Sequence, residues 1–257
     1  MPFKWDQITK RPFYNKYAWA YEELVNKPVK ENSQFIAEYL KKEFGRTDLC
    51  ILDAGCGPGG YSISLGQHGF KVLGIDFSEN QLEIAQKKCS LKNVKFERAN
   101  FMEYESADKF DVILCRGVFN DFTDQNLREQ ALAHFHSLLN DDGILFLDVR
   151  NWEKSREAIE KSPKVKRTVL LSNGRLEFSS MRTLNDDQTY DLVETHRLIT
   201  DDSIHSESFN FKMVCATQEQ LAGQLTHAGF QTPVFYGAYD FETPVEDSVY
   251  IISISRK

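Results

Sequence analysis

Short apolar segments alternate with segments of helical periodicity along residues 33–149 of the chain. The apolar segments predict five strands, at residues 49–53, 71–76, 94–98, 110–115 and 144–149. The periodic segments predict helices at residues 33–44, 60–67, 80–90 and 124–139. Near-continuous apolar strands separated by helices indicate a parallel sheet that is covered on both faces. Ligands of such sheets bind beyond the carboxyl ends of the strands, so we expect the functional residues directly after each strand.

The pattern changes after Pro163 to extended segments joined by short polar turns. The first of these turns, Asn173-Gly174, is a strong hairpin signal. The extended segments span residues 165–172, 175–184, 188–199 and 204–215. They predict a small antiparallel sheet inserted after the fifth strand. A further helix and two more strands, at residues 231–236 and 248–255, complete a seven-stranded main sheet.

The composition fits one large α/β domain with an attached subdomain. The chain has 257 residues, 41% of them hydrophobic, and a formal charge of −7 from 31 basic and 38 acidic side chains. The acidic excess argues against a nucleic-acid partner, because such affinity comes largely from clustered Lys and Arg. The five cysteines are scattered without a C-x-x-C pair, so neither disulfides nor a metal site is expected. No membrane span of roughly 18 apolar residues and no signal-peptide core is found. We therefore expect a cytoplasmic monomer or homodimer with no membrane partner.

A glycine-rich turn follows the first predicted strand, in the segment C-I-L-D-A-G-C-G-P-G-G. Its glycines satisfy the dinucleotide pattern G-x-G-x-x-G, and an acid also closes the second strand. However, Asp53 would face a pyrophosphate unfavourably, whereas it could accept hydrogen bonds from an amino-bearing ligand. A nicotinamide-dependent oxidoreductase is therefore disfavoured. The same turn also satisfies G-x-G-x-G through Gly55, Gly57 and Gly59.

These residues resemble the first motif of the class I S-adenosylmethionine-dependent methyltransferases, which is an acid followed by G-x-G-x-G after the first strand. The resemblance spans residues 14–150 and includes the acid that closes the second strand and the F-D-V-I start of the fourth. It implies a Rossmann-like, doubly wound α/β sheet of seven strands with the last strand antiparallel. It also implies S-adenosylmethionine as cofactor, S-adenosylhomocysteine as product, and no metal.

The resemblance further implies which residues hold this cofactor. Asp76 would accept hydrogen bonds from both ribose hydroxyls, Phe77 would lie against adenine, and Asn100 with Phe101 would meet the adenine edge. The family usually has an acid at the position of Asn100, where an amide carbonyl can still accept from the adenine amino group. The expected cofactor residues are Tyr17, Tyr21, Asp53, Gly55, Cys56, Gly57, Gly59, Asp76, Phe77, Asn100, Phe101, Cys115 and Arg116.

A segment L-D-V-R-N-W at the end of the fifth strand resembles the D-x-R-N-[YW] segment of glycine and sarcosine N-methyltransferases. In those enzymes the arginine pairs with the carboxylate of the amino-acid acceptor, a task that suits a guanidinium fork. The resemblance makes Arg150 the candidate for binding an acceptor carboxylate, with Asn151 and Trp152 beside it. A structural ion pair of Arg150 with Asp148 or Asp121 is the alternative.

The loop after the fourth strand is where this family positions the methyl acceptor. Phe119 and Phe122 would form an aromatic wall for the acceptor. Asn120 and Asp121 would orient or deprotonate it, and Asp121 is the first candidate for a general base. His205, in the inserted sheet, is the second candidate. The loop differs from that of the glycine enzymes, which puts glycine itself in doubt as the acceptor.

An aromatic arm precedes the first long helix. Methyltransferases with a tyrosine-rich segment there fold it over the cofactor, and Tyr14, Tyr17 and Tyr21 have the spacing of such a cover. Tyr17 and Tyr21 lie four residues apart, so both could face inward from one helix. Tyr14 would contact the acceptor. We expect three parts, namely an arm with the first helix, a core and an antiparallel lid, at residues 1–45, 46–160 with 216–257, and 161–215.

The sequence therefore predicts an S-adenosylmethionine-dependent methyltransferase that acts on a small molecule. The resemblance at Arg150 favours nitrogen as the methylated atom and a carboxylate or other anionic group on the acceptor. Two alternatives stay open: a small-molecule O-methyltransferase on the same fold, and a regulator that binds the cofactor without turnover.

Overall fold

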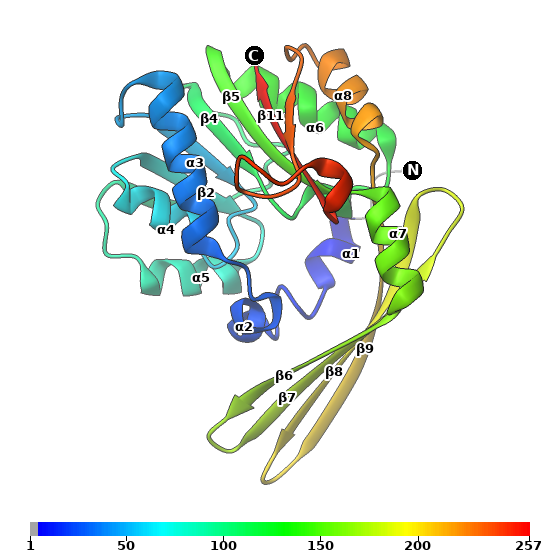
Figure 1. The fold of residues 1–257 in the computed structure, drawn as a ribbon. Helices are drawn as coiled ribbons and strands as arrows, with labels where there is room; N and C mark the ends of the chain where they lie inside the picture. The colour runs from blue at the N-terminus through cyan, green and yellow to red at the C-terminus, as the bar shows by residue number, and fades with distance from the viewer. Residues whose placement is uncertain (1–4) are drawn as a thin grey trace.

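The computed structural model describes residues 5–257, which are built around a seven-stranded sheet (Figure 1). Its strands are β1 (Cys50–Ala54), β2 (Lys71–Asp76), β3 (Val94–Arg98), β4 (Phe110–Cys115), β5 (Leu139–Arg150), β10 (Val234–Tyr236) and β11 (Tyr250–Arg256). Their order across the sheet is β3-β2-β1-β4-β5-β11-β10. Strands β1 to β5 run parallel, and β11 is antiparallel to both of its neighbours. The predicted α/β fold with an antiparallel last strand is confirmed.

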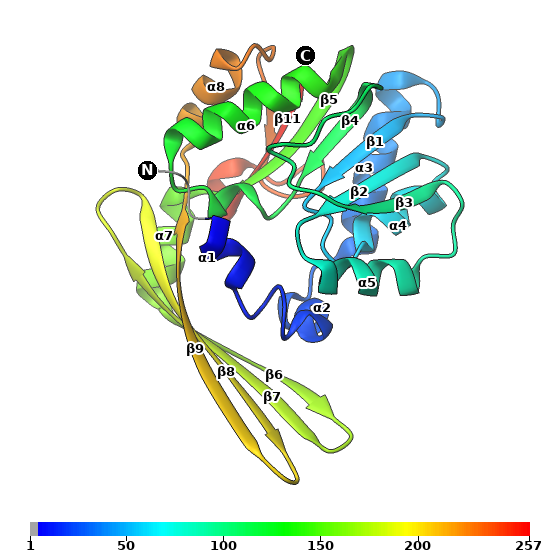
Figure 2. The same cartoon turned by 180° about the vertical axis from the view of Figure 1, so that it is seen from behind.

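Helices cover both faces of this sheet (Figures 1 and 2). They are α3 (Val29–Phe44), α4 (Gly60–Gln67), α5 (Glu79–Lys88), α6 (Gln125–Leu138), α7 (Trp152–Lys161) and α8 (Gln218–His227). On one face, Leu40 of α3 and Leu65 of α4 share a buried cluster with Leu114 of β4. On the other face, Leu132 of α6 shares a second cluster with Ile113 of β4. Every residue of β4 is buried, which explains its continuous apolar sequence.

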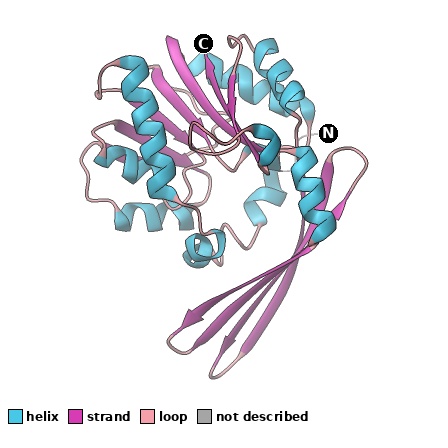
Figure 3. Cartoon of the chain, in the orientation of Figure 1, coloured by secondary structure: helices cyan, strands magenta, loops and turns pink. Residues whose placement is uncertain are grey.

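A second sheet of four antiparallel strands is inserted between α7 and α8. Its strands are β6 (Lys164–Leu171), β7 (Gly174–Leu184), β8 (Thr189–Thr200) and β9 (Ile204–Val214). We call this sheet the lid sheet. It extends away from the main sheet (Figure 3). The insertion of an antiparallel sheet after the fifth strand, predicted from the hairpin pattern, is confirmed.

The N-terminal segment lies between the main sheet and the lid sheet (Figures 1 and 2). It contains α1 (Trp5–Lys10), the short 3-10 turn η1 (Ala18–Ala20) and α2 (Tyr21–Val25), and we call residues 5–28 the arm. The first four residues of the segment expected at 1–45 lie outside the described residues. Phe13 and Leu24 of the arm share a buried cluster with Val169 and Leu176 of the lid sheet. The apolar arm therefore joins the lid sheet to the core.

The structure departs from the predicted elements in three places. The helix α7 is absent from the prediction, because only Ser155 and Ile159 of its residues are buried and its apolar pattern is short. Strand β5 begins at Leu139, five residues before the predicted start of the strand at residue 144. Strand β10 begins only at Val234, since Pro233 before it has no backbone N–H for the ladder. Within residues 5–257, no helix combines the length and the apolarity needed to cross a membrane.

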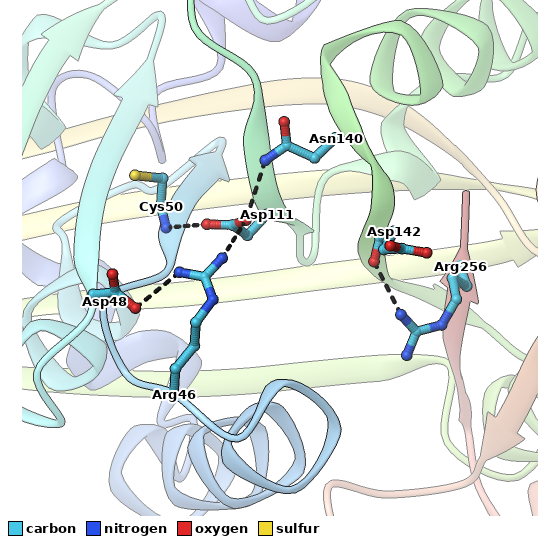
Figure 4. Close-up of polar contacts among 7 residues, drawn as sticks. All are labelled: Arg46, Asp48, Cys50, Asp111, Asn140, Asp142 and Arg256. Atoms are coloured by element: carbon cyan, nitrogen blue, oxygen red, sulfur yellow. Dashed lines mark hydrogen bonds and ion pairs between the residues drawn. The ribbon is translucent and has the colours of Figure 1, made fainter.

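A buried acid ties together the amino ends of three strands (Figure 4). Asp111 Oδ1 accepts hydrogen bonds from Arg46 (2.9 Å) and from Asn140 (3.1 Å). Its Oδ2 accepts from the backbone N–H of Cys50, at 2.8 Å. These partners lie at the start of β1 and β5, beside the start of β4. Asp111 therefore stabilises the edge of the sheet opposite to the carboxyl ends, where ligands bind.

Candidate active site

The carboxyl ends of β1, β2 and β4 open into a cleft with two compartments. The first is lined by residues that follow β2, β3 and β4 and by two tyrosines of the arm, among them Tyr14, Tyr21, Asp76, Phe77, Gln81, Asn100, Phe101, Val118, Asp121 and Phe122. The second lies beside the glycine turn and is lined by residues that include Lys27, Asp53, Cys56, Pro58 and Tyr61. Tyr21, Gly55, Gly57 and Arg116 line both compartments, so the cleft is continuous.

The glycine turn forms the floor of this cleft. The backbone N–H groups of Gly55 and Cys56 both donate to the carbonyl of Ile75, which ties the turn to β2. A Cβ added at Gly55 would lie 2.5 Å from Val118 Cγ2, and its φ is +80°. Gly57 has φ +55°, and a Cβ added there would meet no protein atom within 4 Å. Gly55 is therefore required for packing, whereas Gly57 leaves open space on the side of the cleft.

Asp76, at the end of β2, is held by backbone donors. Its Oδ2 accepts from the N–H of Gly57 and its Oδ1 from the N–H of Ser78, each at 2.8 Å. A carboxylate oxygen has two lone pairs, so each can accept one further hydrogen bond from a ligand. Burial raises the pKa of Asp76 to about 6, against the opposing effect of the backbone donors. The arrangement fits a ligand with two adjacent hydroxyl groups.

Asp53 lies in the second compartment at the end of β1. Its Oδ2 accepts from the Ser62 hydroxyl at 2.5 Å. Burial raises the pKa of the Asp53 carboxyl, and the nearby cations Arg116 and Lys27 oppose this. Asp53 and Glu22 are the acids that line this compartment, and Asp53 is the buried one, so it is the candidate partner for a ligand ammonium.

Two cations complete the second compartment. The Arg116 guanidinium lies between the rings of Tyr61 and Tyr239, at 3.6 and 4.1 Å from their centroids. Its Nε is 3.5 Å from Asp148 Oδ2, and its buried Nη1 has no hydrogen-bond partner among the described residues. Burial lowers the pKa of Lys27. The sequence prediction includes Arg116 but misses Lys27 and Tyr61. Packing of the arm brings Lys27 to the cleft, whereas Tyr61 lies there as the second residue of α4, directly after the glycine turn.

The three tyrosines of the arm have different positions. The Tyr14 ring packs edge-on against Phe77, with centroids 5.9 Å apart, and Tyr21 lines both compartments. Tyr17 is not among the residues that line the cleft. It stacks on His196 of the lid sheet at 4.8 Å, and its hydroxyl donates to Glu207 at 2.9 Å. Tyr17 and Tyr21 do not share one helix, because Tyr17 precedes η1 and Tyr21 begins α2.

The loop after β4 contains the short 3-10 turn η2 (Phe119–Asp121). Phe119 and Phe122 are both fully buried, and Phe122 lines the cleft. Phe119 packs instead beneath Arg128, whose guanidinium lies 4.1 Å from the ring centroid. Asn120 Oδ1 accepts from the backbone N–H of Arg150 at 2.7 Å. Asn120 thus connects the loop to the end of β5.

Asp121 is the acid of this loop, and it lines the cleft. Its Oδ2 accepts from the Tyr14 hydroxyl at 3.0 Å, whereas its Oδ1 is buried without a partner among the described residues. Burial raises the pKa of Asp121 to about 6, although Arg11 and Tyr14 lower it. A buried carboxylate oxygen without a donor is costly, so this atom fits a ligand N–H or O–H.

Arg150, at the end of β5, forms no ion pair with Asp148 or Asp121 within the described chain. Asp148 pairs with Arg116 instead. The Arg150 guanidinium lies 5.2 Å from the ring centroid of Tyr250, and the hydroxyl of Tyr190 on the lid sheet contributes to its raised pKa. Arg150 does not line the two-compartment cleft. It lies behind Asn120, between the main sheet and the base of the lid sheet.

The remaining predicted residues lie outside the cleft. Asn151 donates to the carbonyl of Val245 at 2.9 Å, and Trp152 packs in a cluster at the base of the lid sheet. Cys115 is fully buried in the core between the main sheet and α6. His205 is exposed near the hairpin tip of the lid sheet, at the start of β9, so the structure does not bring it to Asp121.

Gln81 of α5 is a cleft residue that is absent from the predicted site. Its side chain is 2% exposed, and both amide atoms lack a hydrogen-bond partner among the described residues. It lines the first compartment together with Asp76 and Phe77. The sequence feature that could have predicted Gln81 as a cleft residue is its place four positions before the buried Ala85, which puts this polar side chain on the inward face of the helix.

Comparison with known proteins identifies the class to which this fold and cleft belong. The family described as "Methyltransferase domain" matches residues 51–143. A relative from Geobacillus sp. (strain WCH70), whose name classes it among methyltransferases without a substrate, is 28% identical over 95% of this chain and 99% of its own length. The chain contains a methyltransferase domain and is a methyltransferase, and its fold is that of the class I S-adenosylmethionine-dependent enzymes.

Two similarities concern particular enzymes. Glycine/sarcosine N-methyltransferase from Aphanothece halophytica is 32% identical over 52% of this chain and 52% of its own length. The chain thus matches about half the length of that relative. The structure of S-adenosylmethionine-bound CalS10, an amino pentose methyltransferase from Micromonospora echinaspora, shares the fold with a TM-score of 0.70, at 15% identity over 94% of this chain and 97% of that one.

Proposed function

We propose that this methyltransferase acts at a nitrogen atom of a small molecule that carries a carboxylate or another anionic group. The observation on which the proposal rests is Asp121, a buried acid beside the cofactor cleft with one oxygen free to accept a hydrogen bond. The 32% identity to an enzyme named for N-methylation of glycine and sarcosine supports the same assignment.

The cofactor would occupy both compartments. In the first, Asp76 would accept from the ribose hydroxyls, Phe77 would lie against adenine, and Asn100 with Phe101 would meet the adenine edge. In the second, Asp53 would accept from the cofactor ammonium. Of the other expected cofactor residues, Tyr21, Gly55, Cys56, Gly57 and Arg116 line the cleft, and Gly59 shapes the turn.

Lys27 and the free Nη1 of Arg116 are the nearest cations to the second compartment. We assign them to the cofactor carboxylate, because a buried anion needs paired charge or hydrogen-bond donors.

When bound, S-adenosylmethionine supplies an electrophilic methyl group on a sulfonium sulfur, and the electron pair of the broken C–S bond stays with the sulfur. The acceptor nitrogen contributes the electron pair of the new bond and then loses a proton. Asp121 Oδ1 is placed to orient that N–H and to take the proton. The closed aromatic surround of Tyr14, Phe77 and Phe122 would exclude water and hold the reactants in line.

Arg150 is our candidate for the anionic group of the acceptor. Its guanidinium lacks an acidic partner within the described chain, and Asn120 connects its backbone to the loop that bears Asp121. The acceptor would then lie between the loop after β4 and the base of the lid sheet. In this proposal, residues 1–45 cover the cofactor, residues 46–160 and 216–257 form the catalytic core, and residues 161–215 close the acceptor side.

The test is methyl transfer from isotopically labelled S-adenosylmethionine to a panel that contains glycine, sarcosine, amino sugars and matched hydroxy acids. We expect label on nitrogen, and loss of at least about a hundredfold in kcat for Asp121→Asn, the usual size of a general-base effect. Arg150→Gln should raise KM for carboxylate acceptors without changing the affinity for S-adenosylhomocysteine. Arg197→Gln, at an exposed site on the lid sheet, is the matched control.

Label found only on oxygen would overturn the assignment to nitrogen. A cofactor that binds but is never consumed across the panel would instead favour a regulator without turnover. If Arg150→Gln weakened cofactor and acceptor equally, the anion assignment would be wrong.

A further inference from the structure

The arm, the lid sheet and the loop after β4 meet in one chain of buried polar contacts. Arg11 of the arm donates from Nε to Oε2 of Glu194 on β8 (2.9 Å) and from Nη2 to Oε1 (2.5 Å). Its Nη1 donates to the Tyr14 hydroxyl at 2.7 Å. That hydroxyl in turn reaches Asp121 Oδ2 at 3.0 Å. Arg11, Glu194 and Asp121 are at most 6% exposed, so solvent screens these contacts little.

The donors and acceptors of this chain are fixed in one direction. A guanidinium has donors only, so the Tyr14 oxygen must accept from Arg11. The hydroxyl has a single proton, which it then donates to Asp121 Oδ2. Because Oδ2 is always an acceptor here, a proton from the cleft can be taken up only at Oδ1, the atom without a partner among the described residues.

Tyr14 is also fixed at its backbone end. Its carbonyl accepts from the Ser78 hydroxyl at 2.6 Å, and the N–H of Ser78 donates to Asp76 at 2.8 Å. One tyrosine therefore contacts the segment that follows β2 on one side and the acid of the β4 loop on the other. Its ring contact with Phe77 supports the same position.

We propose that Tyr14 is a positioning residue for Asp121, and that the Arg11–Glu194 pair sets its hydroxyl when the arm and the lid sheet dock. This inference rests on the proposed function of Asp121 as the acid that faces the acceptor. Docking of the lid sheet then determines which carboxylate oxygen faces the acceptor: Oδ1 accepts the N–H proton, while Oδ2 stays bound to Tyr14.

The groups that face Asp121 have opposite effects on it. Arg11, the Tyr14 hydrogen bond and Arg150 of β5 lower its pKa, whereas Glu194 of the lid sheet raises it. Removal of the Tyr14 hydroxyl should therefore raise the pKa of Asp121, because a hydrogen bond to the charged form is lost. Removal of the Glu194 charge should lower the pKa of Asp121, because Glu194 then no longer balances the positive charge of Arg11.

The experiment follows the carboxyl ¹³C resonance of Asp121 against pH in protein saturated with S-adenosylhomocysteine, assigned by its loss in Asp121→Asn. For Tyr14→Phe we expect a midpoint about one pH unit higher than in the parent, as one lost hydrogen bond to a charge would give. For Glu194→Gln we expect a lower midpoint. Lys16→Met removes another arm–lid ion pair, with Glu207 at 2.6 Å, and should leave the midpoint unchanged.

A merely structural role for these residues would move both midpoints in the same direction, or neither, and would overturn the inference. If Tyr14→Phe does not fold, an unchanged midpoint in Glu194→Gln has the same consequence. The labelled-methyl assay distinguishes the two proposals. Full activity of Asp121→Asn would end the proposed function and this inference with it, whereas an inactive Asp121→Asn with unmoved midpoints would refute only the positioning role.

Discussion

Replacement of Gly57 by alanine should separate cofactor binding from stability. Gly57 has φ +55°, so an L side chain there costs roughly 1–2 kcal/mol of backbone strain. A Cβ at this position would meet no protein atom within 4 Å, and the residue lines both compartments of the cleft. The added methyl group would therefore stand in the space that the cofactor needs.

Gly45 provides a matched control. It ends α3 with φ +64°, and a Cβ there also meets nothing within 4 Å, but it is exposed and far from the cleft. Gly45→Ala and Gly57→Ala should lower Tm by a similar amount, about 2–4 °C per kcal/mol for a chain of this size. Only Gly57→Ala should lose affinity for S-adenosylhomocysteine, by at least about tenfold, or 1.4 kcal/mol.

Thermal unfolding of the ligand-free variants and calorimetric titration with S-adenosylhomocysteine measure the two quantities. Gly55→Ala extends the series, because its Cβ would lie 2.5 Å from Val118 Cγ2 and should lower Tm more than either variant. Unchanged affinity in Gly57→Ala would refute the reasoning, since the glycine turn would then not be the floor of the cofactor site.

Two further predictions concern the cleft, and a third concerns a helix cap outside it. Affinity for S-adenosylhomocysteine should fall about tenfold from pH 7 to pH 5, because Asp76 must be ionised to accept two hydroxyls and burial raises its pKa to about 6. Titrations of the Asp121→Asn variant should keep this pH dependence, and those of Asp76→Asn should lose it. Gln81→Met should stabilise the ligand-free protein by about 1 kcal/mol, because two buried polar atoms without a hydrogen-bond partner among the described residues are removed. The same substitution should weaken S-adenosylhomocysteine binding in the calorimetric assay. Unchanged affinity would contradict a contact between Gln81 and the cofactor. Thr217→Ala removes the capping box of α8 and should cost about 1 kcal/mol in urea unfolding without an effect on binding.

The centre of the main sheet could be predicted because its strands are buried on both faces. The predicted bounds of β2, β3 and β4 match the observed ones. For β4 the reason is its continuous apolar sequence, whereas the edge strand β3 alternates apolar and charged residues and is largely exposed. The strand ends also locate Asp53, Asp76 and the β4 loop by sequence alone, because parallel strands place their carboxyl ends at one edge.

The arm could not be predicted in the same way. A spacing of four residues places Tyr17 and Tyr21 on one face only if a helix connects them, and here a 3-10 turn lies between the two. Tyr17 therefore packs against the lid sheet, where its ring stacks on His196 and its hydroxyl donates to Glu207. Lys27 reaches the cleft through tertiary packing of the same segment, for which the local sequence has no signal.

The charges of the cleft explain why the pKa values of its acids are raised and which ligand groups would lower them. Two of the buried cations are already paired inside the protein, Arg116 with Asp148 and Arg11 with Glu194. Arg11 and Arg150 lower the pKa of Asp121, but burial outweighs them and raises the pKa of both Asp76 and Asp121 to about 6. Between about pH 4 and 6 the folded, ligand-free protein therefore binds more protons than the unfolded chain does. Its free energy of unfolding falls as the pH rises through that window. A ligand that brings hydroxyl and N–H donors to these two carboxylates stabilises their charged forms. Ligand binding in the cleft and ionisation of its acids are thus coupled. This coupling favours catalysis by Asp121 only when S-adenosylmethionine and the acceptor are both bound.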